Sequence, residues 1–282
     1  MLYLEKCPRA IDPKEYQHKR AEAHDCSELY SEDLMLTTGG VPKIVYFHKA
    51  MDEADTSKLI KMLGKVRYDK STRTNGLVTE SRIFGYAPRN PMRKAPCRAT
   101  AMNRESPKEY SGMKNLADIA AQKYHELNSS LAEHHAGLTR ERVLPSYRIG
   151  ESMFTSGIIN HNNPLNYHFD TGNYKGVWSA MFGMKKGIEG GYLACPEYDM
   201  ALQIGNGSLT MFDGQSILHG VTPIKKLSAS SKRYTVVFYS LRGMWSCKEP
   251  YDELERMRRQ RMRTETDIRK NGRSGPKKNR GK

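Results

Sequence analysis

Short runs of apolar residues follow one another through the second half of the chain, between residues 143 and 239. Turn-forming Gly, Asn and Asp residues separate these runs, and no helical pattern interrupts them. Such runs are typical of β-strands, and successive strands without intervening helices predict an antiparallel sandwich or barrel. The predicted strands are residues 152–159, 177–184, 192–195, 208–212 and 234–241.

The first half of the chain carries a long helical pattern. Residues 114–136 place apolar side chains three and four positions apart, which predicts an amphipathic helix terminated by Gly137. This stripe is typical of a helix that packs on a sheet rather than of a cofactor site. His134 and His135 near its end do not form a metal-binding pair, because adjacent helical residues point in different directions.

Shorter elements precede that helix. Residues 1–40 are polar and weakly periodic, and they end at a Gly-Gly pair. A strand is predicted at residues 43–47. A helix is predicted at residues 52–63, where Asp52 or Asp55 would cap the first turn. Residues 1–40 are therefore interpreted as an N-terminal extension ahead of a folded domain.

The C-terminal residues differ in composition from this domain. Residues 251–282 hold twelve Lys/Arg against five Asp/Glu, a net charge of +7 (12 − 5). Residues 253–263 fit a helix, and the Gly, Ser, Pro, Lys and Arg residues beyond Asn271 predict disorder. The organisation predicted from these patterns is an extension (1–40), a domain (41–247) with helical support (50–136) and a β core (143–245), and a basic tail (248–282).

Residues 81–104 form a basic segment inside the domain. They contain six Lys/Arg, no Asp or Glu, and three prolines, which predicts an exposed loop. Basic side chains near Phe84 and Tyr86 suit a nucleic-acid groove, and a solvated basic loop explains the same composition equally well.

Composition bounds the partners and the compartment. The 282 residues carry a formal net charge of +15, which favours a polyanionic partner such as DNA. Five scattered cysteines without a Cys-x-x-Cys pair make structural zinc improbable and predict reduced thiols. No signal-peptide core and no membrane-spanning stretch are found, which predicts a soluble intracellular protein without a membrane partner.

Candidate chemistry lies in the β core. His168 and Asp170 are two residues apart, so on a strand both side chains point the same way. His219 follows 49 residues after Asp170 (219 − 170). Two histidines and one carboxylate can occupy one face of an Fe(II) octahedron and leave the other face for a co-substrate and O₂. Arg233 lies in an apolar run, where a buried cation needs an anion such as a dicarboxylate co-substrate.

These residues carry a resemblance to a known family. The segment from about residue 148 to 239 resembles the iron- and 2-oxoglutarate-dependent dioxygenases, and within them the TET/JBP branch, which oxidises the 5-methyl group of pyrimidine bases in nucleic acid. The matching strings are His168-Phe169-Asp170-Thr171-Gly172-Asn173, Gly190-Gly191-Tyr192-Leu193-Ala194-Cys195-Pro196-Glu197-Tyr198, Phe212-Asp213-Gly214, His219-Gly220-Val221-Thr222-Pro223 and Arg233-Tyr234-Thr235.

The resemblance implies an α+β fold built on a double-stranded β-helix, the jelly-roll of the cupins, with the helices packed on one sheet. It implies Fe(II), 2-oxoglutarate and O₂ as cofactors, with His168, Asp170 and His219 as both the catalytic and the metal-binding residues. Arg233, Thr235 and Asn160 would contact the co-substrate. The resemblance also assigns Asn173 to the polar edge of a flipped base and Tyr239 to stacking on it.

The chain departs from the family pattern in two respects. Leu241 stands where the 5-methylcytosine oxidisers place a histidine near the end of this strand, which favours thymine as the base. The cysteine-rich zinc region of the vertebrate TET enzymes is also absent from this sequence. The expected reaction is therefore hydroxylation of thymine or 5-methylcytosine in DNA. The compartment would be the cytoplasm of a bacterial or virus-infected cell, or a eukaryotic nucleus.

Three alternatives stay open on the sequence. The same metal triad serves prolyl- and lysyl-type protein hydroxylases, and a basic surface would suit an acidic peptide. AlkB-like demethylation of damaged bases would want a second arginine six residues after Arg233, where this chain has Tyr239. A DNA-binding protein with a decayed site is disfavoured by the complete set of triad residues.

Overall fold

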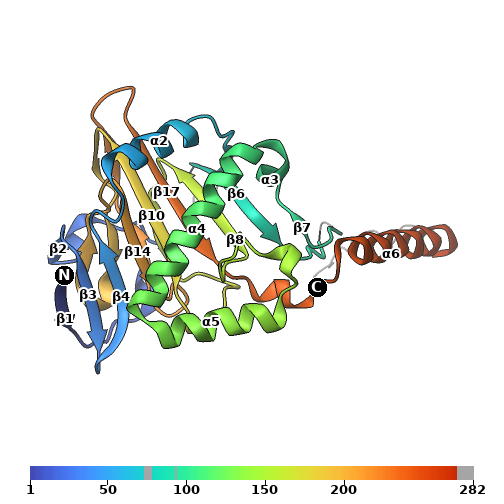
Figure 1. Ribbon diagram of the computed structural model, residues 1–282, viewed down its shortest axis with the longest axis horizontal. Coiled ribbons are helices and arrows are strands. Elements are labelled where there is room, and N and C mark those ends of the chain that lie inside the picture. The colour runs from blue at the N-terminus through green and yellow to red at the C-terminus, as the bar shows by residue number, and fades with distance from the viewer. Residues whose placement is uncertain (73–77, 93, 272–282) are drawn as a thin grey trace, which may run out of the picture.

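The computed structural model describes residues 1–72, 78–92 and 94–271, which form an α+β fold with one large, mostly antiparallel sheet. Helices cover one face of this sheet (Figure 1). The strand order is β1-β3-β4-β14-β10-β17-β8-β6-β5, with β7 paired to β6. The strands are β1 (Leu2–Glu5), β3 (Leu34–Thr38), β4 (Val41–Phe47), β5 (Asp69–Thr72), β6 (Val78–Ala87), β7 (Arg98–Ala99), β8 (Ser156–His161), β10 (Ser179–Lys186), β14 (Ser208–Phe212) and β17 (Lys232–Tyr239).

A smaller sheet packs against the other face of the large one. Its strand order is β2-β13-β12-β15-β9, and β11 and β16 form a separate two-stranded antiparallel sheet. Apolar side chains of both sheets, among them Tyr46, Met181, Leu193 and Leu202, form one buried cluster between them. The strands are β2 (Glu28–Tyr30), β9 (Leu165–His168), β11 (Ile188–Gly190), β12 (Leu193–Cys195), β13 (Met200–Leu202), β15 (His219–Val221) and β16 (Ile224–Lys226).

The strands predicted from apolar runs are confirmed, with shifts of a few residues at their ends. Two facing sheets also agree with the predicted antiparallel sandwich or barrel. The helix predicted at residues 52–63 is α2, and Asp52 caps it by accepting a hydrogen bond from the Asp55 amide at 2.7 Å. The helices are α1 (Pro13–Tyr16), α2 (Glu53–Leu63), α3 (Ala101–Glu105), α4 (Pro107–Leu127), α5 (Ser129–Arg142) and α6 (Pro250–Asn271), with short 3-10 turns η1 (Ala23–Asp25), η2 (Pro145–Tyr147), η3 (Pro196–Tyr198) and η4 (Arg242–Ser246).

The apolar stripe at residues 114–136 packs into the core as predicted, but it spans two helices instead of one. Residues 114–136 fall in α4 and α5, which meet at Asn128. The Asn128 backbone leaves the helical region, and its side chain accepts from the Leu131 amide to cap α5. Gly137 does not terminate the helix, because α5 continues to Arg142 and buries Thr139, whose hydroxyl donates to the Met153 carbonyl.

Residues 1–40, interpreted from the sequence as an extension, contribute strands to both sheets. β1 pairs in parallel with β3 at the edge of the large sheet, and β2 pairs in parallel with β13. Leu34 and Leu36 of β3 are fully buried between the sheets. The periodicity of residues 1–40 is weak because their strands are only three to five residues long, too short to show a clear alternation.

The prediction of one exposed loop across residues 81–104 is wrong. Residues 81–87 belong to β6 in the large sheet, and α3 covers residues 101–105. Arg82 is 6% exposed and forms ion pairs with Asp69, at 3.2 Å, and Glu105. The sequence could not show these partners, because Asp69 and Glu105 lie outside the segment. Between β6 and β7 the chain does run without regular helix or strand where it is described.

The prediction that all thiols are reduced is also wrong. Cys97 and Cys247 form a disulfide, although 150 residues separate them. Cys7, Cys26 and Cys195 are free cysteines. Spacing could not reveal the pair, because the end of η4 and the β6–β7 connection become neighbours only in the folded chain.

The helix predicted at residues 253–263 is confirmed and is longer, since α6 covers Pro250–Asn271 and projects from the body (Figure 1). Glu253 anchors its first turn by accepting hydrogen bonds from Arg89, at 3.0 Å, and from the Lys248 and Cys97 amides. Burial raises the pKa of Glu253, but these hydrogen bonds outweigh it and bring the pKa down to about 2. The predicted disorder beyond Asn271 lies outside the described residues. Within the described part of the chain, none of the helices has the length and apolar character needed to cross a bilayer.

His135 on α5 makes folding stability depend on pH. It is fully buried, its Nε2 lies 2.8 Å from the Ser240 hydroxyl, and its Nδ1 has no hydrogen-bond partner among the described residues. Burial lowers the pKa of His135 from 6.5 to about 3. Between those values the unfolded chain binds a proton that the folded chain excludes, so the free energy of unfolding falls as the pH falls, by up to about 1.4 kcal/mol per pH unit.

Chemical denaturation between pH 3 and pH 7 measures this dependence. His135→Gln is expected to flatten the profile, because glutamine does not titrate. His134→Gln, at the exposed neighbouring position, serves as the control and should keep the wild-type slope. Equal slopes in the wild type and His135→Gln would contradict the assignment.

Candidate active site

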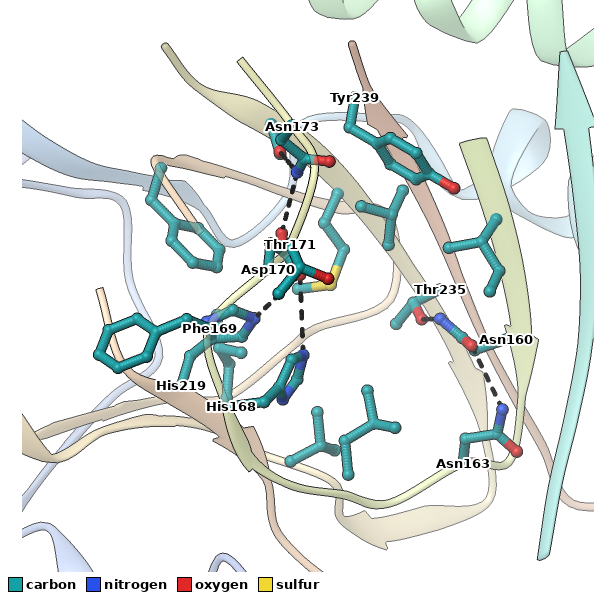
Figure 2. Close-up of a pocket in the computed structure, with 18 of the residues that line it drawn as sticks. Asn160, Asn163, His168, Phe169, Asp170, Thr171, Asn173, His219, Thr235 and Tyr239 are labelled. Carbon is teal, nitrogen blue, oxygen red and sulfur yellow. Dashed lines mark hydrogen bonds and ion pairs between the residues drawn. The ribbon is translucent and has the colours of Figure 1, made fainter. Parts of the chain in front are cut away.

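A cavity of about 320 Å³ lies between the two sheets and contains every site residue that the sequence predicted. Figure 2 shows most of these side chains pointing into it. The large sheet supplies one wall through β8, β10 and β17, and β9, β12 and β15 supply the other. The lining residues are Ile158, Asn160, Asn163, Leu165, His168, Phe169, Asp170, Thr171, Asn173, Ser179, Met181, Leu193, Phe212, His219, Val221, Arg233, Thr235, Val237, Tyr239 and Leu241.

His168, Asp170 and His219 come together on the small-sheet side of the cavity. β9 and β15 are antiparallel neighbours in which His168 and His219 stand directly opposite each other. Asp170 Oδ1 lies 3.7 Å from His168 Nε2 and 4.0 Å from His219 Nε2 (Figure 2). One potential ligand atom from each residue lies within 4.8 Å of the others, which is close enough for all three to bind one metal ion.

Backbone carbonyls orient both imidazoles. His168 Nδ1 lies 2.8 Å from the Asn166 carbonyl oxygen, and His219 Nδ1 lies 2.9 Å from the Ile217 carbonyl oxygen. A carbonyl oxygen only accepts, so each Nδ1 carries the proton and each Nε2 carries the lone pair. Hydrogen bonds of this kind fix the ring orientation that a metal-ligating histidine needs.

Gly214 allows Asp170 to take its position. The Asp170 amide donates to the Gly214 carbonyl at 2.8 Å. A Cβ atom on Gly214 would lie 2.3 Å from Asp170 Oδ2, well inside contact distance. Asn173 Nδ2 donates to the same carboxylate oxygen at 3.3 Å, so the carboxylate is held from both sides.

Gly214→Ala is therefore expected to displace Asp170 and to weaken metal binding by about 10- to 100-fold, which is the usual cost of removing support around metal ligands. Calorimetric titration with Mn²⁺ measures this effect. Gly137→Ala is the matched control, because a Cβ there meets nothing within 4 Å. Unchanged Mn²⁺ affinity in Gly214→Ala would show that the carboxylate tolerates the displacement.

Arg233 occupies the cavity wall as a buried cation. It is 2% exposed, and its Nη2 donates to the Gly191 carbonyl at 3.0 Å. Its Nε has no partner, and no carboxylate of the described residues forms an ion pair with it. Burial lowers the pKa of Arg233 to about 10, which leaves the guanidinium charged at neutral pH. A buried charge of this kind is satisfied by an anionic ligand that enters the cavity.

Gly191 makes room for this arginine. Its backbone has a φ of +66°, a region that glycine adopts without strain. A Cβ at this position would lie 2.8 Å from Arg233 Nε. The Gly191 backbone therefore approaches the guanidinium closely, and its carbonyl accepts the hydrogen bond from Arg233 Nη2.

Thr235 and Asn160, which the resemblance assigned to the co-substrate, line the same cavity as Arg233. They are cross-strand neighbours on β17 and β8, and Asn160 Nδ2 donates to Thr235 Oγ1 at 3.3 Å. Asn163 extends this chain by donating to Asn160 Oδ1 at 3.3 Å (Figure 2). Asn163 was missed in the sequence analysis. Its only signal was its place in the polar run 160–163, which is equally typical of a loop.

Asn173 and Tyr239 lie farther along the cavity. Tyr239 is six residues after Arg233 on β17, a separation of about 20 Å along a strand. Burial raises the pKa of Tyr239 and the Asp170 charge adds to this, so the phenol stays protonated. Asn173 forms a β-bridge with Leu241, which also lines the cavity. Because Asp170 only accepts, Asn173 must turn its amide nitrogen to the carboxylate, which leaves Oδ1 as the acceptor of this side chain.

Comparison with known proteins identifies the family of this domain. Residues 83–242 match the Tet_JBP family, described as the oxygenase domain of the 2OGFeDO superfamily. This segment is more than half of the chain and contains all the predicted site residues. The match agrees with the resemblance drawn from the sequence motifs.

Curated relatives include two proteins named "Bifunctional helicase and thymine dioxygenase JBP2". The protein from Trypanosoma brucei brucei is 27% identical over 244 residues, which cover 83% of this chain and 22% of the relative. The protein from Trypanosoma cruzi is 26% identical over 199 residues, which cover 70% of this chain and 17% of the relative. The aligned region thus spans about a fifth of these longer relatives.

A solved structure described as NgTET1 in complex with 5mC DNA shares the fold. Its TM-score is 0.58 at 14% sequence identity, covering 82% of this chain and 86% of that chain. The double-stranded β-helix expected from the sequence is therefore confirmed, with helices α4 and α5 on the outer face of the large sheet (Figure 1).

Proposed function

The chain belongs to the Tet_JBP family of oxygenase domains in the 2OGFeDO superfamily, and from this membership we propose that it hydroxylates the 5-methyl group of a pyrimidine base in DNA. The observation that carries the proposal is one cavity with three functional parts. The His168–Asp170–His219 cluster, the buried cation Arg233, and the pair Asn173 and Tyr239 all line the same cavity.

The residues present fit the cofactors that the superfamily uses. His168, Asp170 and His219 would hold Fe(II), because their ligand atoms lie within 4.8 Å of one another. Arg233 would bind the distal carboxylate of 2-oxoglutarate, since its buried guanidinium lacks a carboxylate among the described residues. When bound, Fe(II), 2-oxoglutarate and O₂ supply the oxidant that hydroxylates an unactivated C–H bond.

The chain's own residues position the substrate and exclude water. The apolar lining, including Met181, Phe212 and Val237, keeps the reacting methyl group out of bulk solvent. Asn160 and Thr235 present an amide and a hydroxyl beside Arg233, where a co-substrate carboxylate would accept hydrogen bonds. The 5-methyl group of a paired base lies in a groove of the duplex and does not reach a cavity between two sheets, so the reacting nucleotide must flip out of the duplex or come from a single strand.

Asn173 and Tyr239 would hold the flipped base. Asn173 Oδ1 would accept from the polar edge of the base, and the Tyr239 ring would pack on its face. Leu241 lines the cavity where it can contact a base but offers no hydrogen bond. Thymine is the base we favour, because Leu241 replaces the histidine of the 5-methylcytosine oxidisers and the curated relatives are named thymine dioxygenases.

Nucleoside mass spectrometry tests this function. DNA containing thymine without 5-methylcytosine, and DNA containing 5-methylcytosine, would be incubated separately with protein, Fe(II), ascorbate and 2-oxoglutarate. We expect a gain of one oxygen on thymidine that is absent with His168→Ala. Product from 5-methyldeoxycytidine alone would reassign the base. Succinate without a nucleoside product would reject DNA as substrate and return the protein hydroxylase as the alternative.

Helix α6 would hold DNA by its phosphates. Its arginines at positions 256, 258, 259, 261 and 263 are exposed or partly exposed. Changing Arg259, Arg261 and Arg263 to Gln is expected to weaken DNA binding. The slope of log affinity against log salt is negative, and its magnitude should decrease by about 0.9 for each phosphate that the variant no longer neutralises. Fluorescence anisotropy of labelled duplex DNA measures both quantities.

The matched control removes the same charge from another helix. Lys58, Lys61 and Lys65 are exposed on or just after α2, which lies away from α6 (Figure 1). Their replacement by Gln should leave the salt slope nearer to that of the wild type. An equal decrease of the slope in both triple variants would mean that α6 contributes general charge rather than a binding surface.

A further inference from the structure

The two tryptophans of the chain have opposite environments. Trp178 is 3% exposed and stacks on Tyr124 with ring centroids 5.0 Å apart. Trp245 is 38% exposed, although large aromatic side chains are normally buried. It lies in η4, the 3-10 turn that follows the cavity strand β17. An exposed indole at this place in the chain is available to a ligand.

η4 is attached directly to the wall of the cavity. The Arg242 amide donates to the Gly172 carbonyl at 2.9 Å, and Leu241, one residue earlier, forms a β-bridge with Asn173. Trp245 packs on Tyr174, the residue after Asn173, with ring centroids 5.1 Å apart. The indole is therefore fixed beside the segment that would hold the flipped base.

One guanidinium lies over this indole, and two further exposed cations lie on the neighbouring segments. The Arg142 guanidinium, at the end of α5, lies 5.8 Å from the Trp245 ring centroid. Arg242 and Lys175 are exposed on the two segments that meet at the β-bridge. None of these three side chains forms an ion pair with a carboxylate in the described part of the chain. An exposed aromatic ring among such cations is complementary to a nucleic-acid strand, whose bases stack and whose phosphates are anionic.

We propose that Trp245 stacks on a base next to the reacting nucleotide and that Arg142 and Arg242 bind the flanking phosphates. Extraction of one base from a duplex exposes the faces of its neighbours, and the rim of the cavity is where these neighbours must lie. This proposal rests on the proposed function in DNA and extends it to an interaction surface. The indole would also keep the neighbouring base from following the flipped one into the cavity.

Tryptophan fluorescence tests the stacking directly, because Trp178 is buried and Trp245 is exposed. The full chain would be titrated with fluorescein-labelled duplex DNA containing a central thymine, without 2-oxoglutarate. Anisotropy of the label and tryptophan emission would be followed in parallel samples. We expect DNA to quench the emission and to protect it from iodide over the same concentrations at which anisotropy rises. Trp245→Phe should remove the emission change.

The DNA affinities of variants at position 245 test whether an aromatic ring is needed there. Trp245→Ala is expected to weaken DNA binding by about tenfold, within the range for one base–aromatic stack, whereas Trp245→Phe should largely retain the affinity. Trp245→Ala should leave the salt slope unchanged. Arg142→Gln and Arg242→Gln should each reduce the magnitude of this negative slope by about 0.9.

The outcomes separate a failure of the proposed DNA-binding surface from a failure of the proposed function. DNA binding with unchanged tryptophan emission and wild-type affinity in Trp245→Ala would overturn the stacking surface and leave the proposed function standing. Unchanged salt slopes in both arginine variants would overturn the phosphate contacts. The absence of any anisotropy change with the wild-type chain would overturn the surface together with the proposed action on DNA.

Discussion

Replacing Asp170 by Asn is expected to reduce 2-oxoglutarate turnover by at least about 100-fold, since loss of even an outer partner of a metal ligand costs 10- to 100-fold. Asparagine keeps the shape of the side chain but removes the negative charge that faces both imidazoles at 3.7 and 4.0 Å. Succinate formation measures the turnover. Calorimetric titration with Mn²⁺ should show a matching loss of metal affinity, which does not depend on catalysis.

The control for this variant is a second carboxylate outside the site. Asp55 on α2 pairs with Lys58 at 2.9 Å and is exposed, so Asp55→Asn should leave both Mn²⁺ affinity and turnover at wild-type values. Thermal unfolding without metal should be similar for Asp170→Asn and the wild type. If Asp170→Asn retains Mn²⁺ binding, the three residues do not form the metal site.

Replacing Arg233 by Met should have opposite effects on co-substrate binding and on the stability of the protein alone. Hydrogen bonds to a charged group contribute about 1.5–3 kcal/mol each, so removal of a two-pronged contact should raise the KM for 2-oxoglutarate by about 100-fold or more. The wild-type chain alone buries the Arg233 charge without a carboxylate, and methionine removes that cost. The melting temperature without ligand should therefore rise in Arg233→Met.

Arg82 provides the matched control for this experiment. It is nearly as buried, at 6% exposure, but it pairs with Asp69 and Glu105. Arg82→Met should lower the melting temperature and leave the KM for 2-oxoglutarate unchanged. Addition of 2-oxoglutarate with Mn²⁺ should stabilise the wild type and Arg82→Met but not Arg233→Met. A wild-type KM in Arg233→Met would show that this arginine does not bind the co-substrate.

The site residues could be predicted more completely from the sequence than the contacts of the elements that hold them. His168 and Arg233 are chemically unusual for strands, and Asp170 follows His168 closely, so their residue types marked the site; the family resemblance supplied Asn160 and Tyr239. All of them line one cavity. Local spacing was not sufficient by itself, because β9 ends at His168 and Asp170 lies just beyond the strand, where its amide donates to the Gly214 carbonyl.

Features that depend on distant parts of the chain could not be predicted. The Cys97–Cys247 disulfide and the ion pairs of Arg82 join segments that become neighbours only after folding. The roles of Gly191 and Gly214 depend on space beside Arg233 and Asp170, which no local pattern records. The break at Asn128 was readable in principle, because asparagine is a good cap, but the apolar stripe continues across it.

The most direct test of thymine hydroxylation uses DNA in which the thymine methyl groups carry deuterium. Hydroxylation at this methyl group predicts a nucleoside that has gained one oxygen and has given up one of its three methyl deuterium atoms, formed in step with succinate and absent with Asp170→Asn. A product that keeps all its methyl deuterium, or succinate formation that leaves every nucleoside unchanged, would contradict the proposal that this cavity oxidises the 5-methyl group of thymine.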